Sequence, residues 1–367
     1  MKKSGTEWTN NPWPLVTIGM LVLLVFIAGA CTTLSSVFAG ALPAAQPPLV
    51  TAGADSTATP TAFGPQAPTE TPPPPPPGTP TPIASPTPIN PWGDFPAPVE
   101  ASAIEIRRPV AELPVSDETV NIIIMGSDQR PYSYGNNTDV MMLLSLDPKA
   151  GTAKLLSFPR DLYVFIPGWR VDRINVADAV GGPEAVAQTI RYNFGLNVDH
   201  WMLLYFWDFT GIIDALGGID VQVGGLLYDE CGGIQWDYSP GTYHMDGFTA
   251  LCYVRMRKNS GDFDRLRRQQ EVVMAVFQRV LTLDGLAKAP ELYDRFKGMI
   301  ETDMTLSDIL PLIPLGTRLA SDSSRIQRLA ITADMGELWR VPYSGASVVL
   351  PRWDAIEAML HEAFPAR

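Results

Sequence analysis

Proline decides which part of this chain can build a packed core. More than half of its 35 prolines lie between Pro43 and Pro98, including the run Pro72–Pro77, among Thr, Ala, Ser and Gly and almost no charge. Such a segment cannot bury a core and is expected to be an extended, disordered spacer, partly polyproline II. We predict residues 39–100 as an extracytoplasmic linker. Residues 101–367 remain, enough for one large domain with a substantial core.

An uncharged apolar run precedes the linker. A membrane span needs about 20 mostly apolar residues, and residues 15–38 supply them. We predict a single-pass transmembrane anchor there, with residues 1–14, which include Lys2 and Lys3, in the cytoplasm. The alternative is a cleaved signal peptide, with lipidation at Cys31 as one form, because small residues precede that cysteine. The anchor places the chain at the cell membrane, and under either alternative the bulk of the chain is expected to be extracytoplasmic.

Positive charge is concentrated in one short segment, although the whole chain has a formal net charge of −12. Clustered cations repel one another unless acids or a bound anion offset the repulsion, and guanidinium groups are shaped to grip phosphate oxygens in pairs. The segment therefore indicates a site for a phosphate-rich ligand. Its cations are Arg255, Arg257, Lys258, Arg265, Arg267 and Arg268.

Three apolar runs rich in β-branched residues predict strands over residues 120–125, 140–146 and 152–157, the last two joined as a hairpin. If the first strand is antiparallel to the second, one sheet edge collects aspartates beside arginines. Such an edge suits a metal-bound phosphate ester, although each residue alone also fits an ordinary solvated loop. The residues are Asp128, Arg130, Asp139, Arg160 and Asp161.

The remaining pattern of strands and helices has no regular βαβ repeat. It predicts an α/β fold, a single layered α-β-α domain with a mixed central sheet. Helices are expected over residues 183–192, 209–216 and 262–281, and a strand over 219–223. Residues 251–257 alternate as in a strand, which would place Arg255 and Arg257 on one face.

The predicted helix over 262–281 separates its polar residues by face. At 3.6 residues per turn, Arg265 and Gln269 lie at one border of the apolar stripe and Arg268 slightly further round. Arg267 faces outward with Glu271. We therefore predict Arg265, Arg268 and Gln269 as site residues and Arg267 as a surface ion-pair partner.

Two further features leave alternatives open. Cys231 and Cys252 are the cysteines of the folded region, and outside the cytoplasm they either close a disulfide or remain two separate buried thiols. Residues 201–213 carry many large apolar side chains. These side chains either line a groove for a lipid or simply belong to the core.

Six segments in order resemble the successive motifs of the LytR-CpsA-Psr (LCP) family of bacterial cell-wall proteins. Each motif alone is weak, but their collinear order behind a membrane anchor is specific. The segments are Asn121–Arg130, Thr138-Asp139, Ser157–Asp161, Gly217–Val221, Gly247–Arg257 and Asp262–Gln270.

The resemblance implies an enzyme that transfers a glycopolymer from a polyprenyl-pyrophosphate lipid to peptidoglycan through a phosphodiester, with Mg²⁺ or Mn²⁺ as cofactor. Asp128 and Asp139 would hold the metal, and Asp128 or Asp161 would take the proton of the acceptor hydroxyl. Arginines and a glutamine would hold the pyrophosphate, Arg160 also serving catalysis with the aspartates. The resemblance assigns Arg160, Arg255, Arg257, Arg265 and Gln269 to this binding set, and the residue pattern adds Arg130 and Arg268.

Two other functions also fit these residues. A pyrophosphatase would use water in place of the sugar hydroxyl at the same site, and a binder or sensor of lipid-linked glycans would not turn them over. A nucleic-acid partner is not expected, because the bulk of the chain is predicted outside the cytoplasm. An acyl-ester hydrolase is disfavoured because His200 and His244 belong to no recognisable triad.

Overall fold

A computed structural model describes residues 90–128, 137–258, 261–283 and 289–365. The predicted anchor and residues 39–89 of the predicted linker lie outside these residues. Within the described part, no helix combines the length and the apolar character needed to cross a bilayer.

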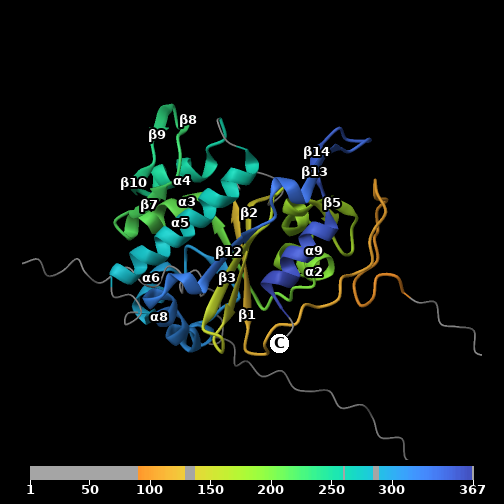
Figure 1. The fold of residues 1–367 in the computed structure, drawn as a ribbon, viewed down its shortest axis with the longest axis horizontal. Helices are drawn as coiled ribbons and strands as arrows, with labels where there is room; N and C mark the ends of the chain where they lie inside the picture. Colours follow the sequence, from red (N-terminus) through yellow and green to blue (C-terminus); the bar gives the residue numbers. More distant parts are fainter. Residues whose placement is uncertain (1–89, 129–136, 259–260, 284–288, 366–367) are drawn as a thin grey trace, which may run out of the picture. The chain divides into compact units, whose positions relative to one another are not determined.

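A six-stranded mixed sheet forms the centre of the fold, in the order β11-β6-β1-β2-β3-β12 (Figure 1). β2 and β3 form the predicted antiparallel hairpin. β1 is antiparallel to β2, which meets the condition under which the sequence gathers the charged residues at one edge. β6 runs parallel to β1, and β12 runs parallel to β3. The strands are β1 (Val120–Ser127), β2 (Thr138–Asp147), β3 (Thr152–Ser157), β6 (His200–Tyr205), β11 (Glu301–Thr302) and β12 (Ile326–Ala330).

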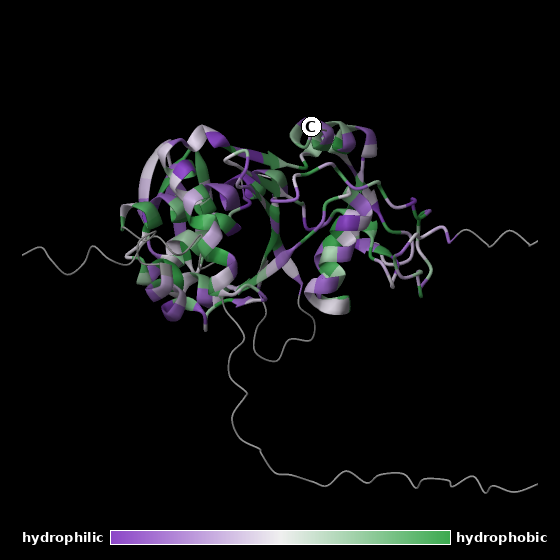
Figure 2. Cartoon of the chain, turned by 90° about the horizontal axis from the view of Figure 1, so that it is seen from below, coloured by the Kyte–Doolittle hydropathy of each residue, from purple (hydrophilic) through white to green (hydrophobic). Residues whose placement is uncertain are grey.

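Helices cover both faces of this sheet (Figures 1 and 2). Alternate residues of β1 enter two separate cores, Ile122 and Ile124 on one face and Ile123 and Met125 on the other, because successive side chains of a strand point to opposite faces. The layered α-β-α architecture is therefore confirmed. On the first face lie α3 (Phe206–Ala215), α4 (Gly247–Arg255), α5 (Asp262–Thr282), α6 (Ala289–Phe296) and α8 (Ile313–Ser321), and on the second α2 (Ala177–Phe194) and α9 (Trp353–Ala363).

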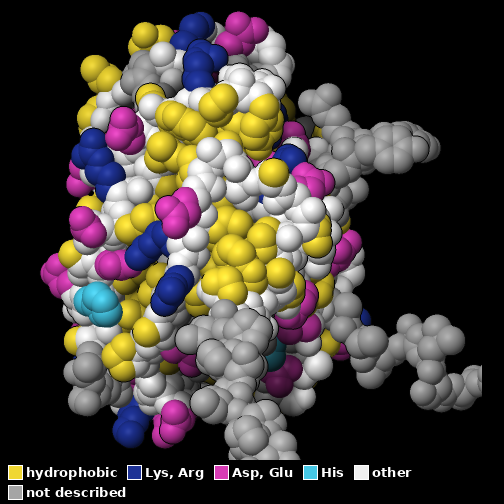
Figure 3. All heavy atoms as spheres, turned by 90° about the vertical axis from the view of Figure 1, so that its right-hand side faces the viewer, with side chains coloured by type: hydrophobic (Ala, Val, Ile, Leu, Met, Phe, Trp, Pro, Cys, Tyr) yellow, Lys and Arg dark blue, Asp and Glu magenta, His cyan; other side chains and the backbone are white. Residues whose placement is uncertain are grey.

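Short two-stranded sheets surround the central sheet. Residues 90–119 run along the side of α2 and α9, where the N–H of Val110 donates to the carbonyl of Tyr192 at 3.0 Å. Figure 3 views the molecule from that side and shows apolar patches between charged side chains. The small sheets pair β4 (Tyr163–Phe165) with β5 (Val171–Arg173), β7 (Ile219–Val223) with β10 (Gly241–Met245), β8 (Leu227–Cys231) with β9 (Ile234–Tyr238), and β13 (Gly336–Arg340) with β14 (Ser347–Pro351).

One predicted element is wrong. Residues 251–255 belong to helix α4 and not to a strand. The side chain of Asp246 caps this helix by accepting a hydrogen bond from the N–H of Thr249 at 2.8 Å, which satisfies a free donor of the first turn. Buried Ala250, Leu251 and Tyr253 then pack the helix against its neighbours. Arg255 and Arg257 consequently do not share a strand face.

Candidate functional site

Asp139 and Arg160 meet at the edge where β2 begins and β3 ends. Arg160 donates to Asp139 through Nη1 at 2.7 Å and to Asp161 through Nε at 3.3 Å. The three side chains are 20 to 24% exposed, so they can interact with a ligand. The antiparallel pairing of β1, β2 and β3 brings these residues together, as the sequence predicted.

Burial alone lowers the pKa of Arg160, but the hydrogen bond to Asp139 and the charges of Asp139, Asp161 and Asp262 outweigh it and raise that pKa. Arg160 is therefore a permanent cation. Sequence reasoning missed Arg173 in β5, whose Nη1 lies 3.6 Å from Oδ1 of Asp161. Only the register between β4 and β5, which pairs Tyr163 with Arg173, places it there.

A second charged group lies where α4 leads into α5. Asp262, in the first turn of α5, lies 3.4 Å from Nε of Arg257 and 3.8 Å from Nη1 of Arg265. Its charge also acts on Arg160. Asp262 thus connects Arg257 and Arg265 to the sheet edge, a role that the sequence did not indicate. Asp264 is the acid that accepts from the N–H of the N-cap, Gly261, at 3.2 Å.

The predicted site face of α5 is buried. Arg265, Arg268 and Gln269 are 3%, 1% and 5% exposed. Arg268 donates to the carbonyl of Met256, and burial lowers its pKa. Nε of Arg265, Nε of Arg268 and Oε1 of Gln269 have no hydrogen-bond partner among the described residues. Unpaired buried polar atoms are uncommon and call for an explanation such as a bound ligand.

Arg267 and Arg255 differ from these residues. Arg267 pairs with Glu271 on the outer face of α5, so its predicted role as a surface ion-pair partner is confirmed. Arg255 is exposed at the end of α4, and its guanidinium lies 5.3 Å from the ring centroid of Phe206, within the range of a cation–π contact.

Gln270 fixes α5 on the sheet. Its Nε2 donates to the Leu329 carbonyl at 2.7 Å, to Oγ of Ser157 at 2.9 Å and to the Leu155 carbonyl at 3.3 Å. These acceptors belong to β3 and β12. The site face of α5 is thereby held at a set distance from the end of β3, which precedes Arg160.

An apolar cavity of about 80 Å³ lies between the sheet and α3, α4 and α5. Gln269 is the polar side chain among the described residues that line it, so the cavity adjoins the arginine-bearing face of α5. Part of the predicted groove segment, Leu204, Phe206 and Phe209, belongs to this lining. The other lining residues are Ile124, Met125, Gly126, Val140, Met142, Leu251, Val254, Val272, Val273 and Val276.

Asp128 and Arg130 are the remaining predicted site residues. Asp128 is exposed immediately after β1. Because Ser127 pairs with Thr138 and the strands are antiparallel, Asp128 and Asp139 lie at the same sheet edge, on opposite sides of that pair. Arg130 lies outside the described residues. Among the described residues no group of three or more His, Cys, Asp or Glu side chains is placed to hold a metal. Two carboxylates nevertheless fit Mg²⁺, which commonly takes one or two protein carboxylates together with water and substrate phosphates.

Solved structures share this fold. The TagV protein of B. subtilis superposes with a TM-score of 0.58 at 25% identity, over 69% of this chain and 100% of that one. The TagU protein of B. subtilis superposes with a TM-score of 0.51 at 23% identity, over 67% and 96% of the two chains.

Two proteins of other bacteria have similar sequences. This chain is 32% identical over 215 residues to a polyisoprenyl-teichoic acid–peptidoglycan teichoic acid transferase TagU of Oceanobacillus iheyensis, covering 56% of this chain and 66% of the relative. It is 28% identical over 249 residues to a protein of the same name from Halalkalibacterium halodurans, covering 67% and 80%. The first match thus spans slightly less than two thirds of the relative.

The charged edge, the arginines of α4 and α5 and the layered fold all lie inside one family match. Residues 98–362 match the sequence model of the LytR_cpsA_psr family. This range covers well over half of the chain, so the protein belongs to the LytR-CpsA-Psr family.

Proposed function

We propose that the chain transfers an anionic glycopolymer from a polyprenyl-pyrophosphate carrier to peptidoglycan through a phosphodiester link. One observation carries this proposal: the apolar cavity adjoins, through Gln269, the buried arginine face of α5. An amphiphile would place its anionic head at the arginines and the first carbons of its hydrocarbon tail in the cavity. The relatives named as polyisoprenyl-teichoic acid–peptidoglycan teichoic acid transferases support the same chemistry.

The arginines would hold the pyrophosphate. Arg160 and Arg257 are partly exposed and share the nearby acid Asp262, so an arriving anion finds preorganised cations. The Nε–H groups of Arg265 and Arg268 have no acceptor among the described residues, so both could donate hydrogen bonds to the pyrophosphate. Arg130 and Arg255 complete the proposed binding set with Gln269.

The reaction needs positioning and charge neutralisation more than a protein nucleophile. The acceptor hydroxyl of peptidoglycan attacks the phosphorus that bears the glycan, a new P–O bond forms, and the bond to the bridging oxygen breaks. Polyprenyl phosphate leaves with that oxygen. Asp128 or Asp161 takes the proton of the hydroxyl. Arg160 lies between Asp139 and Asp161 and offsets charge on the phosphate oxygens.

Asp128 and Asp139 would hold Mg²⁺ or Mn²⁺. When bound, the metal would neutralise negative charge on the phosphate oxygens. Membrane attachment through residues 15–38, with the catalytic domain outside the cytoplasm, belongs to the same proposal. It would keep the site on the side where peptidoglycan lies.

Two other functions use the same residues. A pyrophosphatase would direct water to the phosphorus, and a binder would lack turnover. Arg160 donates hydrogen bonds to both Asp139 and Asp161. This arrangement favours an enzyme that turns its substrate over, because a protein that only binds the pyrophosphate would need the arginines but not the carboxylates.

Filling the cavity tests the lipid half of the proposal. Val273→Phe should weaken binding of geranylgeranyl pyrophosphate by about tenfold or more, since the ring takes the space of the tail, and leave inorganic pyrophosphate binding unchanged. Val180→Phe is the matched control, because Val180 is 38% exposed on α2, across the sheet from the cavity. Equal lipid affinity in both variants would contradict a tail in this cavity.

A further inference from the structure

The β8–β9 hairpin stands on the side of the arginine site and pairs with no other strand among the described residues (Figure 1). Its turn consists of Gly232 and Gly233, both with positive φ, at 62° and 76°. A two-stranded hairpin is marginally stable by itself. Contacts with the rest of the domain must therefore hold it.

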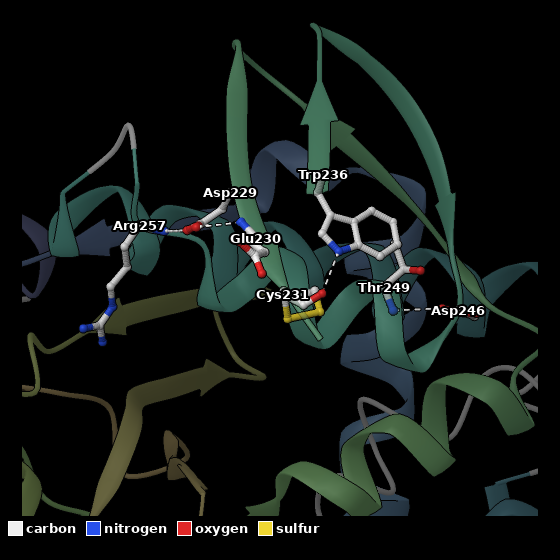
Figure 4. Close-up of a disulfide and its surroundings, with 8 residues drawn as sticks. Asp229, Glu230, Cys231, Trp236, Asp246, Thr249 and Arg257 are labelled. Atoms are coloured by element: carbon white, nitrogen blue, oxygen red, sulfur yellow. Dashed lines mark hydrogen bonds between the residues drawn. A yellow bond between two sulfur atoms is a disulfide. The ribbon is translucent and has the colours of Figure 1, made fainter. Parts of the chain in front are cut away.

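Those contacts attach the hairpin to α4. A disulfide joins Cys231, the last residue of β8, to Cys252 in α4, which confirms the disulfide alternative (Figure 4). Nε1 of Trp236 donates to the carbonyl of Cys231 at 3.2 Å, and its ring lies 6.4 Å from that of Phe248 in α4. The hairpin and α4 therefore form one connected unit.

Asp229 extends this unit to the arginine segment. Its Oδ2 accepts hydrogen bonds from the backbone N–H of Arg257 at 2.5 Å and of Lys258 at 3.0 Å, and Figure 4 shows the first of these. Burial opposes ionisation of Asp229, but hydrogen bonds from the backbone of Arg257, Glu230 and Lys258 outweigh it and lower its pKa. The acceptor is therefore a carboxylate at neutral pH.

Met256, Arg257 and Lys258, the described residues directly after α4, belong to no helix or strand. α4 ends at Arg255 and α5 begins at Asp262. On its inner side, Arg268 donates to the carbonyl of Met256. On the outer side, Asp229 accepts from the next two N–H groups. Arg257 then reaches Asp262, whose charge acts on Arg160.

We propose that Asp229 is a positioning residue: the disulfide-anchored hairpin uses its carboxylate to fix the backbone at Arg257, and so aims this guanidinium at the pyrophosphate of the lipid substrate. This inference rests on the proposed function, because it takes Arg257 as a ligand of the pyrophosphate. The β8–β9 hairpin would thereby contribute to substrate binding, a role that its sequence does not indicate.

The test compares Asp229→Ala, Asp229→Asn and Arg257→Ala in the full chain in detergent, with geranylgeranyl pyrophosphate as the probe. Asp229→Ala loses both hydrogen bonds and should weaken binding about tenfold, while the Asn amide oxygen still accepts them and should keep affinity within about twofold. Asp237→Ala is the control on β9, opposite Tyr228 of β8 and exposed. It should leave affinity unchanged.

The double variant separates positioning from a general loss of structure. Once Arg257 is removed, its placement no longer matters, so Asp229→Ala should add little to Arg257→Ala. Multiplying effects, or an Asn variant as weak as the Ala variant, would overturn the inference. If Arg257→Ala weakens binding and Asp229→Ala does not, the inference fails and the proposed function stands. If the unaltered chain does not bind the probe, or Arg257→Ala has no effect, the proposed pyrophosphate site itself fails.

Discussion

Asp178 should destabilise the fold progressively as pH rises from 3.8 to about 6, and Asp178→Asn should remove this effect. Asp178, in the first turn of α2, is 6% exposed, and its Oδ2 has no hydrogen-bond partner among the described residues. Burial, followed by the charge of Glu301, raises its pKa from 3.8 to about 6. A shift of about two units corresponds to about 3 kcal/mol at about 1.4 kcal/mol per unit.

The raised pKa of Asp178 determines the direction in which stability changes with pH. The folded state binds the proton more tightly than the unfolded state. The neutral carboxyl therefore costs nothing below about pH 3.8, stability falls as pH rises from there to about 6, and it is level at higher pH. Asn mimics the neutral carboxyl at every pH. At pH 8 it should therefore stabilise the chain by about 3 kcal/mol, and at pH 5 by about half as much.

Thermal unfolding at the two pH values measures this difference. At about 2–4 °C per kcal/mol for a domain of this size, the midpoint of Asp178→Asn should lie about 6–12 °C above the unaltered chain at pH 8. The gap should narrow at pH 5. Asp237→Asn, at an exposed position, should show no such gap. An equal gap at both pH values, or none at pH 8, would refute a buried carboxylate as the cause.

Further predictions concern the site and the docking of α5. Asp139→Ala should abolish turnover of a pyrophosphate lipid in Mg²⁺, because it removes a proposed metal ligand and the partner of Arg160. Arg267→Ala, on the outer face of α5, should retain turnover. If both variants fold and lose turnover equally, the assignment of Arg267 to the outer face is contradicted. Gln270→Ala should lower the free energy of unfolding by about 3 kcal/mol, because the buried carbonyl of Leu155 and the partly buried carbonyl of Leu329 lose their hydrogen bonds to Gln270. An unchanged denaturant midpoint would contradict this.

Sequence periodicity predicted the sheet edge well. The three apolar runs became β1, β2 and β3 in the expected pairing, because each run is long enough to define its period and a short turn joins the last two. The pairing alone then brought Asp139, Arg160 and Asp161 together. The helical period likewise separated Arg267 from Arg265 and Gln269 correctly.

Short segments were less predictable. Residues 251–257 fit both a strand and a helix by period, and the cap by Asp246 decided for a helix. Asp262 has an ordinary capping position in the sequence, yet it lies between Arg257 and Arg265. The contact with Arg257 depends on the path of the chain between α4 and α5, which local pattern does not specify.

The cavity and the hairpin contact depend on tertiary structure. The cavity lining comes from β1, β2, β6, α3, α4 and α5, so no single segment reveals it. Asp229 lies 28 residues from Arg257 in sequence. The predicted location outside the cytoplasm made a disulfide between Cys231 and Cys252 one alternative. Only the fold shows that this disulfide anchors a hairpin beside the arginines.

The most direct measurement is a transfer assay with the purified chain. The chain is incubated with a lipid-linked pyrophosphate glycan and labelled peptidoglycan in Mg²⁺, with and without a chelator. Covalent attachment of the glycan to peptidoglycan, lost when the chelator is present, is the predicted result. Release of free sugar phosphate without attachment, or tight binding without any turnover, would contradict the transferase function.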